Sequence, residues 1–360
     1  MKSRYLLLYI FLFVRFSTVY AQQVNGRVIL FGDAGEINPK QEGLLHHAAA
    51  MVIPTKTHVF FLGDNIYEHG MPVDSNGRGH AEDIISKQFT PFRQAQAPVY
   101  FMAGNHDWDK SGPQGLEKVK AQEQFLQAQQ DKDLHFIPKA GTTGPVAVPL
   151  TDHVVAIVYD SEYLLYPGNY KNTDLYNQAL SRFTSDLDNL LQTYADQTVL
   201  LMCHHPMVSY GEHGLKFSWK QHLFPLTKKW RKFYLPLPVV GSAYPLLRAT
   251  AFRSAEDLPH PVYKNLIQKV TAITEKYPQV IFISGHDHGL QFIEKNNKTQ
   301  IVSGSGSKTS MIYKGKGLVY AYEKQGFCTL DLLDNGDLLL RYYIYENDTA
   351  TQTFEKHLKR

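Results

Sequence analysis

The sequence predicts an α/β fold, and three observations support that prediction. Short apolar runs recur along the chain, as expected for buried strands. Stretches with the apolar spacing of helices lie between these runs. Five of the runs end in loops that contain Asp, Asn or His beside glycine or proline. Alternating strands and helices build a sheet covered by helices, so we expect the polar loops to gather at its strand ends.

The individual elements follow from these patterns in chain order. The apolar runs predict strands at 28–32, 59–63, 99–103, 154–158, 199–203 and 280–284. Helical spacing predicts helices at 41–52, 81–94, 116–130, 175–194 and 263–277. Between them, residues 68–80 are rich in Gly, Asp, Asn and His and are expected to form a loop.

The last part of the chain has a different pattern. Apolar runs predict strands at 301–302, 319–322, 327–333 and 338–345, and Asp334-Asn335-Gly336 is a strong hairpin turn signal. We therefore expect antiparallel strands at about 318–346, added to the second half of the fold. The chain has no internal repeat and no low-complexity linker. We therefore expect a single domain that spans residues 22–360.

The N-terminus has the features of a secretory signal peptide. Lys2 and Arg4 precede an apolar run at 5–14, and Val19-Tyr20-Ala21 supplies small residues for cleavage. The prediction is a signal peptide at 1–21, a secreted, periplasmic or other extracytoplasmic location, and no transmembrane anchor after cleavage. An uncleaved anchor is the alternative, but Arg15 interrupts the run before the roughly 20 apolar residues that a membrane span needs.

Composition excludes some classes of function. The chain has 360 residues, 43% of them hydrophobic, which suits one large or two small globular domains. Loss of 1–21 brings the formal charge from +3 to zero, so the mature chain has no basic bias towards nucleic acid. Two cysteines, Cys203 and Cys328, are too few for a disulfide scaffold, although a single bridge between them stays open.

One segment, at about 216–262, is predicted to be an insertion. Its first part, 216–253, contains many Lys and Arg residues and no acidic residue, with aromatic residues interleaved. Such a segment suits a lid over an anionic substrate or a patch that binds a membrane surface. The alternative is an insertion that packs its aromatic rings on the domain and leaves its lysines in water.

Residues that bind metals follow five of the expected strands. The loops are Gly32-Asp33-Ala34-Gly35, Gly63-Asp64-Asn65-Ile66-Tyr67, Gly104-Asn105-His106-Asp107, His204-His205-Pro206 and Gly285-His286-Asp287-His288. Oxygen and nitrogen ligands without a thiolate suit iron, manganese or zinc. The candidate ligands are too many for one ion and fit two ions that share a carboxylate. Two ions about 3.5 Å apart can clamp a phosphoryl group and hold a hydroxide for attack.

The order of these motifs resembles the purple acid phosphatases, a group within the calcineurin-like metallophosphoesterases. The resemblance spans 28–288, and Asp64-Asn65-Ile66-Tyr67 and Glu212-His213-Gly214 are most similar to the small tartrate-resistant type. It implies a four-layer αββα sandwich of two mixed β-sheets flanked by helices. It also implies a secreted dinuclear-metal phosphatase that hydrolyses phosphomonoesters by attack of a metal-bound hydroxide.

The resemblance also implies a ligand set for each ion. The first ion is expected to bind Asp33, Asp64, Tyr67 and His288. The second is expected to share Asp64 and to bind Asn105, His204 and His286. Gly35 stands where most of the wider superfamily has a histidine ligand, and Tyr67 supplies a replacement. A phenolate favours a trivalent ion, so we expect Fe³⁺ in the first site and Fe²⁺, Zn²⁺ or Mn²⁺ in the second.

Other residues near these motifs have expected roles beside the metals. His106 and His213 are candidates for the acid or hydrogen-bond donor that the phosphoryl oxygens and leaving group need. His205 and Asp107 are expected to support the ligands or to face the substrate, with Asp107 as a possible partner that orients His106. The role of Asp160, at the end of another expected strand, stays open.

Two other functions remain compatible with the sequence. The same motifs allow a phosphodiesterase or pyrophosphatase, and a binding protein with an inactive site is the alternative from another class. The full ligand set argues against the last of these. The expected substrate is a phosphorylated small molecule or a phosphoprotein, and no specific nucleic acid is expected. The sequence does not indicate the oligomeric state.

Overall fold

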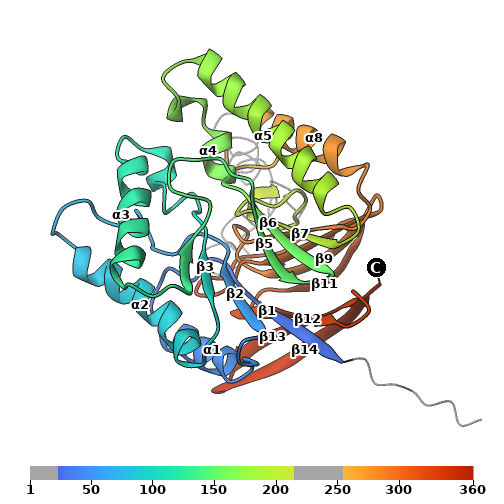
Figure 1. Cartoon of the computed structure of the whole chain (residues 1–360). Helices are drawn as coiled ribbons and strands as arrows, with labels where there is room; N and C mark the ends of the chain where they lie inside the picture. Colours follow the sequence, from blue (N-terminus) through green and yellow to red (C-terminus); the bar gives the residue numbers. More distant parts are fainter. Residues whose placement is uncertain (1–22, 215–253, 360) are drawn as a thin grey trace, which may run out of the picture.

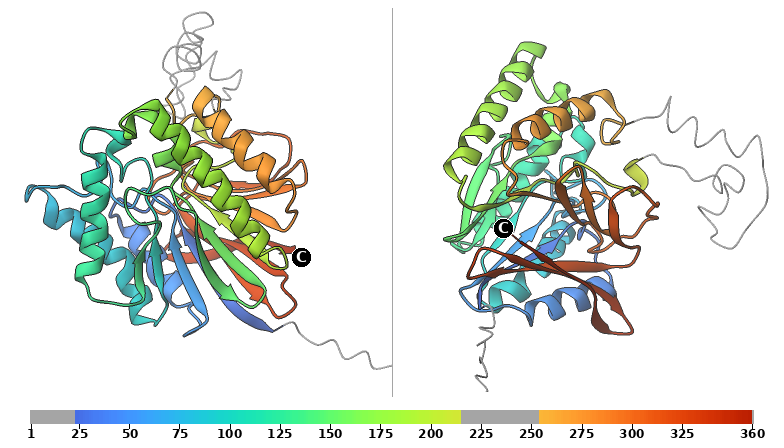
Figure 2. Two further views of the ribbon diagram at one scale, coloured as in Figure 1. Left: turned by 45° about the horizontal axis from the view of Figure 1, so that its top comes forward. Right: turned by 90° about the vertical axis from the view of Figure 1, so that its right-hand side faces the viewer.

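The computed structural model describes residues 23–214 and 254–359. Two seven-stranded sheets stack face to face, with helices on both outer sides (Figures 1 and 2). The predicted α/β fold of four layers is therefore confirmed. The expected signal peptide and most of the expected insertion lie outside the described residues.

The first sheet combines four parallel strands with three antiparallel ones. Its order is β14-β13-β12-β1-β2-β3-β4. The parallel strands are β1 (Val24–Phe31), β2 (Thr57–Phe61), β3 (Val99–Phe101) and β4 (Leu134–Phe136). The antiparallel strands, from the end of the chain, are β12 (Gly326–Leu333), β13 (Leu338–Glu346) and β14 (Thr349–Leu358).

The second sheet has four parallel strands at its centre and antiparallel strands at its edges. Its order is β11-β9-β10-β8-β7-β6-β5. The central strands are β6 (Val154–Val158), β7 (Thr198–Met202), β8 (Val280–Ser284) and β10 (Lys298–Ser303). The outer strands are β5 (Val146–Thr151), β9 (Leu290–Lys295) and β11 (Leu318–Tyr322).

The longer helices cover the outer faces of the two sheets. The first sheet carries α1 (Pro39–Ala49), α2 (Arg78–Gln94) and α3 (Gly115–Ala128), and the second carries α5 (Thr173–Thr193) and α8 (Pro261–Thr274). The short elements are α4 (Ser161–Leu165) and the 3₁₀ turns η1 (Asp109–Ser111), η2 (Pro167–Asn169) and η3 (Glu212–Gly214). The apolar face predicted for 175–194 is buried in α5, where Leu180, Phe183 and Leu187 pack on the second sheet.

The core between the sheets is built from the inward faces of the central strands. Val28 and Leu30 of β1 and Phe60 of β2 belong to one buried cluster with Val154 of β6 and Leu200 of β7. Because both faces of these strands are covered, their sequences are continuously apolar rather than alternating. This burial holds the carboxyl ends of the parallel strands in fixed relative positions.

Three features of the fold differ from the expectations or go beyond them. The strands β4, β5, β9 and β14 and the helix α4 were not expected; β4 has only three residues, and β14 is a largely exposed edge strand with mostly polar residues. Both Cys203 and Cys328 are buried free thiols, so the bridge that the sequence left open is absent. Within 23–214 and 254–359, every helix is too short or too polar to cross a membrane.

Candidate metal centre

The loops after five strands meet at one end of the two stacked sheets. They follow β1, β2, β3, β7 and β8, and they carry the residues that the sequence marked as candidate ligands. Asp33, Asp64 and His286 have left-handed backbone conformations, with φ of 59°, 55° and 69°. Such conformations are rare outside glycine and concentrate at functional sites, where the surrounding structure holds them.

Glycine precedes the ligands because the loops pack against one another. A Cβ atom on Gly63 would lie 2.6 Å from His204 Nδ1, and one on Gly104 would lie 2.3 Å from Asp64 Oδ1. Both distances are shorter than any contact that a real Cβ atom makes. The glycines therefore allow the close approach of the Asp64, Asn105 and His204 loops.

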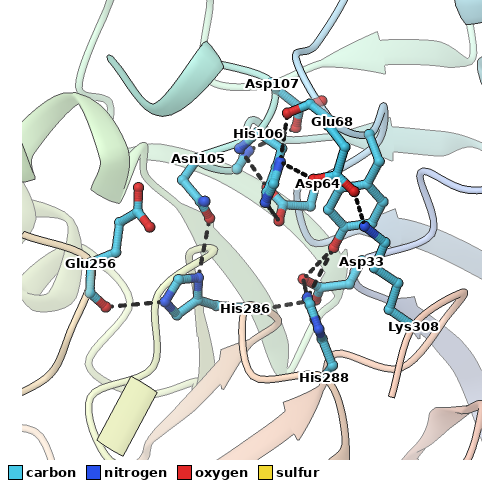
Figure 3. A network of polar contacts seen from close by, with 12 residues as sticks. Asp33, Asp64, Glu68, Asn105, His106, Asp107, Glu256, His286, His288 and Lys308 are labelled. Atoms are coloured by element: carbon cyan, nitrogen blue, oxygen red, sulfur yellow. Dashed lines mark hydrogen bonds and ion pairs between the residues drawn. The ribbon is translucent and has the colours of Figure 1, made fainter. Parts of the chain in front are cut away.

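One group of candidate ligands gathers around Tyr67. The Tyr67 hydroxyl lies 3.1 Å from Asp33 Oδ1 and 3.1 Å from His288 Nε2. His288 Nε2 is itself 3.5 Å from Asp33 Oδ1, and one ligand atom from each of Asp33, Asp64 and His288 lies within 4.8 Å of the others (Figure 3). These four residues are the set expected for the first ion.

A second group gathers around Asn105. Its Oδ1 lies 2.9 Å from His204 Nε2 and 3.1 Å from His286 Nδ1, and the two ring nitrogens are 3.3 Å apart. His204 Nε2 is also 3.4 Å from Asp64 Oδ1. Asp64 therefore lies between the two groups, and the structure brings all seven candidate ligands together.

The hydrogen bonds behind this second group determine what it can hold. His204 Nδ1 faces the Leu62 carbonyl at 2.8 Å, and His286 Nε2 faces the Glu256 carbonyl at 3.1 Å (Figure 3). A carbonyl only accepts, so in each neutral ring that nitrogen carries the proton and the other presents a lone pair. Two nitrogen lone pairs and the Asn105 carbonyl oxygen thus converge on one point. Three acceptors aimed at each other fit a cation placed between them.

The electrostatics of the site show the same need for positive charge. Burial raises the pKa of Tyr67 well above its usual range, and the carboxylates of Asp33 and Asp64 raise it further. Burial opposes the charge of Asp64, but His204 and His106 lower its pKa overall. Tyr67 therefore becomes a phenolate only when a cation displaces its proton.

Asp107 is hydrogen-bonded to the ligand loops and not to His106. Its carboxylate accepts from the Gly104 N–H at 2.8 Å, from the Asn65 N–H at 3.1 Å and from Asn65 Nδ2 at 3.0 Å. The expected pairing of Asp107 with His106 is therefore wrong. Asp107 instead joins the loop that carries Asp64 to the loop that carries Asn105.

His106 is held by the main-chain carbonyl of Glu68. His106 Nδ1 donates to the Glu68 carbonyl at 2.7 Å, and the Glu68 carboxylate lies 3.5 Å from the same nitrogen (Figure 3). His106 Nε2 faces Asp64, with 4.0 Å between Nε2 and Oδ2. This places the second ring nitrogen beside the residue common to both groups of ligands.

His213 lies on the opposite side of the site and has an acidic partner. Its Nδ1 is 3.2 Å from Asp257 Oδ1, and its ring centroid is 4.0 Å from that of His286. Burial lowers the pKa of His213, but the hydrogen bond that His213 donates to Asp257 and the charge of Asp287 raise it overall.

His205 lies beside the candidate ligands, and both of its ring nitrogens have polar neighbours in α4. Its Nδ1 lies 2.8 Å from Ser161 Oγ, and its Nε2 lies 3.7 Å from Glu162 Oε2. Its ring packs on His286 with 4.3 Å between centroids, and a nitrogen of His205 lies within 4.8 Å of one from His204 and one from His286. Asp160, left open by the sequence, caps α4 and accepts from Trp108 Nε1 at 2.9 Å.

Several residues of the site were not singled out from the sequence. Glu256 and Asp257 lie in the last part of the expected insertion, after its basic and aromatic stretch, and Lys308 lies in the loop between β10 and β11, far in sequence from the groups that it contacts. A local sequence pattern does not identify them. Glu68 directly follows Tyr67, and that position was the only signal for it.

Comparison with known proteins identifies the class to which the fold and site belong. Residues 26–238 match the family model for calcineurin-like phosphoesterases, so the chain belongs to that family. The two histidines of the last motif, His286 and His288, lie beyond the matched range.

Within the family, the chain is similar to purple acid phosphatases, which confirms the resemblance. It is 22% identical to purple acid phosphatase 7 of Arabidopsis thaliana over 330 residues, covering 89% of this chain and 83% of that protein. It is 22% identical to tartrate-resistant acid phosphatase type 5 of Oryctolagus cuniculus over 252 residues, covering 69% of this chain and 61% of that protein.

Solved structures share the fold at lower sequence identity. GAP50, described as the anchor in the inner membrane complex of Plasmodium, gives a TM-score of 0.59 at 15% identity, covering 93% of this chain and 89% of that chain. The purple acid phosphatase PPD1 from yellow lupin (Lupinus luteus) seeds gives 0.51 at 15% identity, covering 92% of this chain and 53% of that chain.

Proposed function

We propose that this protein is a dinuclear-metal phosphatase that hydrolyses phosphomonoesters. The observation that carries the proposal is the convergence of His204 Nε2, His286 Nδ1 and Asn105 Oδ1, each of which offers a lone pair to a cation when the two rings are neutral. Asp64 lies between this group and the group around Tyr67. One carboxylate between two ligand groups suits two ions that share it.

Each ion has a proposed set of ligands. Asp33, Asp64, Tyr67 and His288 hold the first ion, and Asp64, Asn105, His204 and His286 hold the second. When bound, two such ions supply positive charge that stabilises a phosphoryl group and a hydroxide that attacks it. The hydrogen bonds from His204 to the Leu62 carbonyl and from His286 to the Glu256 carbonyl fix the tautomer of each neutral ring and aim its unprotonated nitrogen inward.

Two histidines flank the site and act on the substrate rather than on the metals. His106 presents Nε2 towards Asp64, because its Nδ1 proton is donated to the Glu68 carbonyl. His213 faces the site from the other side and is held by Asp257. We assign them to hydrogen bonding with the phosphoryl oxygens and to proton donation to the leaving group.

Tyr67 indicates the kind of metal in the first site. Its pKa is raised by burial and by two carboxylates, so a cation must offset a large cost to bind the phenolate. A trivalent ion does this more readily than a divalent one, which supports Fe³⁺ in the first site. Fe²⁺, Zn²⁺ or Mn²⁺ is proposed for the second, whose ligands are two imidazoles, an amide and the shared carboxylate.

The proposed substrate is a phosphomonoester of a small molecule or a phosphoprotein, and the proposed location is extracytoplasmic. The test is turnover of a chromogenic phosphomonoester and of a matched phosphodiester by protein loaded with iron and zinc. Faster turnover of the monoester supports the proposal, and faster turnover of the diester favours a phosphodiesterase. Two bound metals without turnover of either would favour a binding protein.

A further inference from the structure

Lys308 lies in the loop between β10 and β11. This loop is hydrogen-bonded to the main chain of Asp33 and His288, two candidate ligands of the first ion. The N–H and the hydroxyl of Ser307 both donate to the Asp33 carbonyl, at 2.9 and 2.6 Å. The Ser310 N–H donates to the His288 carbonyl at 2.7 Å. Lys308 is therefore held between two points that are fixed to candidate ligands of the same ion.

The loop is also held from its other side. The Ser307 carbonyl accepts from Gln325 Nε2 at 2.6 Å and from Asn38 Nδ2 at 3.2 Å. A Cβ atom on Gly306 would lie 2.8 Å from the Gly32 carbonyl oxygen, so the loop packs tightly on the end of β1. Few other positions are open to the backbone that carries Lys308.

The ammonium group of Lys308 lies over the face of the Tyr67 ring. Nζ is 3.6 Å from the ring centroid, and 22% of the side chain is exposed. The Glu68 carboxylate pairs with the ammonium (Figure 3). Glu36 Oε2 lies 3.8 Å from the same nitrogen. The two carboxylates keep the ammonium in place, and its partial burial limits screening by water.

A cation at this position acts on the electrons of the ring. When phenolate bound to Fe³⁺ absorbs visible light, an electron moves from the ring to the metal and leaves the ring more positive. A positive charge 3.6 Å from the ring centroid raises the energy of that excited state. The same positive charge stabilises the electron that the iron gains on reduction. It therefore raises the reduction potential of the iron.

We propose that Lys308 is a positioning residue that sets the electronic energy of the Tyr67 phenolate, and with it the colour and the reduction potential of the iron. This inference rests on the proposed function, because it requires iron bound by Tyr67. The structure that carries it is the anchored loop, the 3.6 Å approach to the ring and the acidic groups that hold the ammonium.

The experiment compares three variants with the wild type after loading with iron. Lys308→Met keeps most of the side-chain length and removes the charge, and Lys308→Arg keeps the charge. Lys276→Met is the matched control, since Lys276 lies in the turn after α8 and pairs with Asp188 of α5 at 3.1 Å. The readouts are the wavelength of the visible band and the reduction potential from a spectroelectrochemical titration.

The expected result is a shift of the visible band to longer wavelength and a lower reduction potential in Lys308→Met alone. The other two variants should keep the values of the wild type. A visible band that stays in place in Lys308→Met would overturn this inference and leave the proposed function intact. An iron-loaded wild type without a visible band would contradict the role of Tyr67, and this inference with it. If Lys308→Met loses iron, the same comparison is made with Lys308→Gln.

Discussion

Removal of the Asp107 carboxylate is the sharpest test of how the candidate centre is held. Asp107 is fully buried and accepts from two main-chain N–H groups, those of Asn65 and Gly104, and from the Asn65 side chain. In Asp107→Ala both main-chain groups lose their acceptor in a site closed to bulk water. An unsatisfied buried donor costs about 1–3 kcal/mol, so two of them predict a loss of about 2–6 kcal/mol. The loops of Asp64 and Asn105 also lose the group that joins them, so metal affinity should fall as well.

The assay for this prediction is urea unfolding of the metal-free protein, with metal content measured separately. Asp107→Asn keeps one acceptor oxygen in nearly the same shape and should lose less stability than Asp107→Ala. Asp186→Ala is the control, because Asp186 forms an exposed ion pair with Arg182 at 3.7 Å on α5 and should cost at most about 1 kcal/mol. A loss below about 1 kcal/mol in Asp107→Ala would refute the assigned role of Asp107.

Three further predictions concern the bridging ligand, the histidines without metal and the pH dependence of stability. Asp64→Asn should lose metal and activity together, and near-normal metal content and turnover in that variant would contradict the shared-ligand assignment. His106→Ala and His213→Ala should keep both metals and lower turnover by roughly 10²–10⁴, and metal loss would show that a ligand was mistaken for a catalytic residue. Burial lowers the pKa of His58 to about 4, with a further contribution from His135. As the pH falls, the unfolded chain therefore protonates His58 at a higher pH than the folded chain does. The contribution of neutral His58 to stability is complete above about pH 6.5 and falls by about 3 kcal/mol as the pH drops to about 4. His58→Phe should lose less stability than the wild type between pH 7 and pH 4.5 in urea unfolding, and equal losses would count against this cause.

The sequence predicted the parts of the fold that depend on complete burial. The strands that carry the site are apolar on both faces, as in Thr198–Met202. Such a continuous apolar run can be recognised in the sequence without knowledge of distant contacts. The candidate ligands were found for the same reason, since each follows such a strand in a short loop. Helix ends agreed to within a few residues, with Asn38 and Asn172 as side-chain caps of α1 and α5.

The parts that the sequence did not predict depend on contacts between distant segments. Lys308 pairs with a residue 240 positions away, and the partner of His213 lies 44 positions further along the chain, near the end of the expected insertion. The sequence suggested His106 as a partner for Asp107, because the two residues are adjacent in the chain. Its real partners are set by the packing of two loops. The edge strand β14 was missed because its exposed faces carry polar residues.

The central claim is that Tyr67 binds a trivalent iron ion in a dinuclear centre, and one measurement tests it most directly. The visible spectrum and metal content of the purified wild type are compared with those of Tyr67→Phe, which removes one oxygen and little volume. The proposal predicts two metals per chain, iron among them, and a pink or violet wild type. Tyr67→Phe should lose the colour, bind the first ion more weakly and keep its fold. A colourless wild type that contains iron, or a variant that keeps its colour, would contradict the claim.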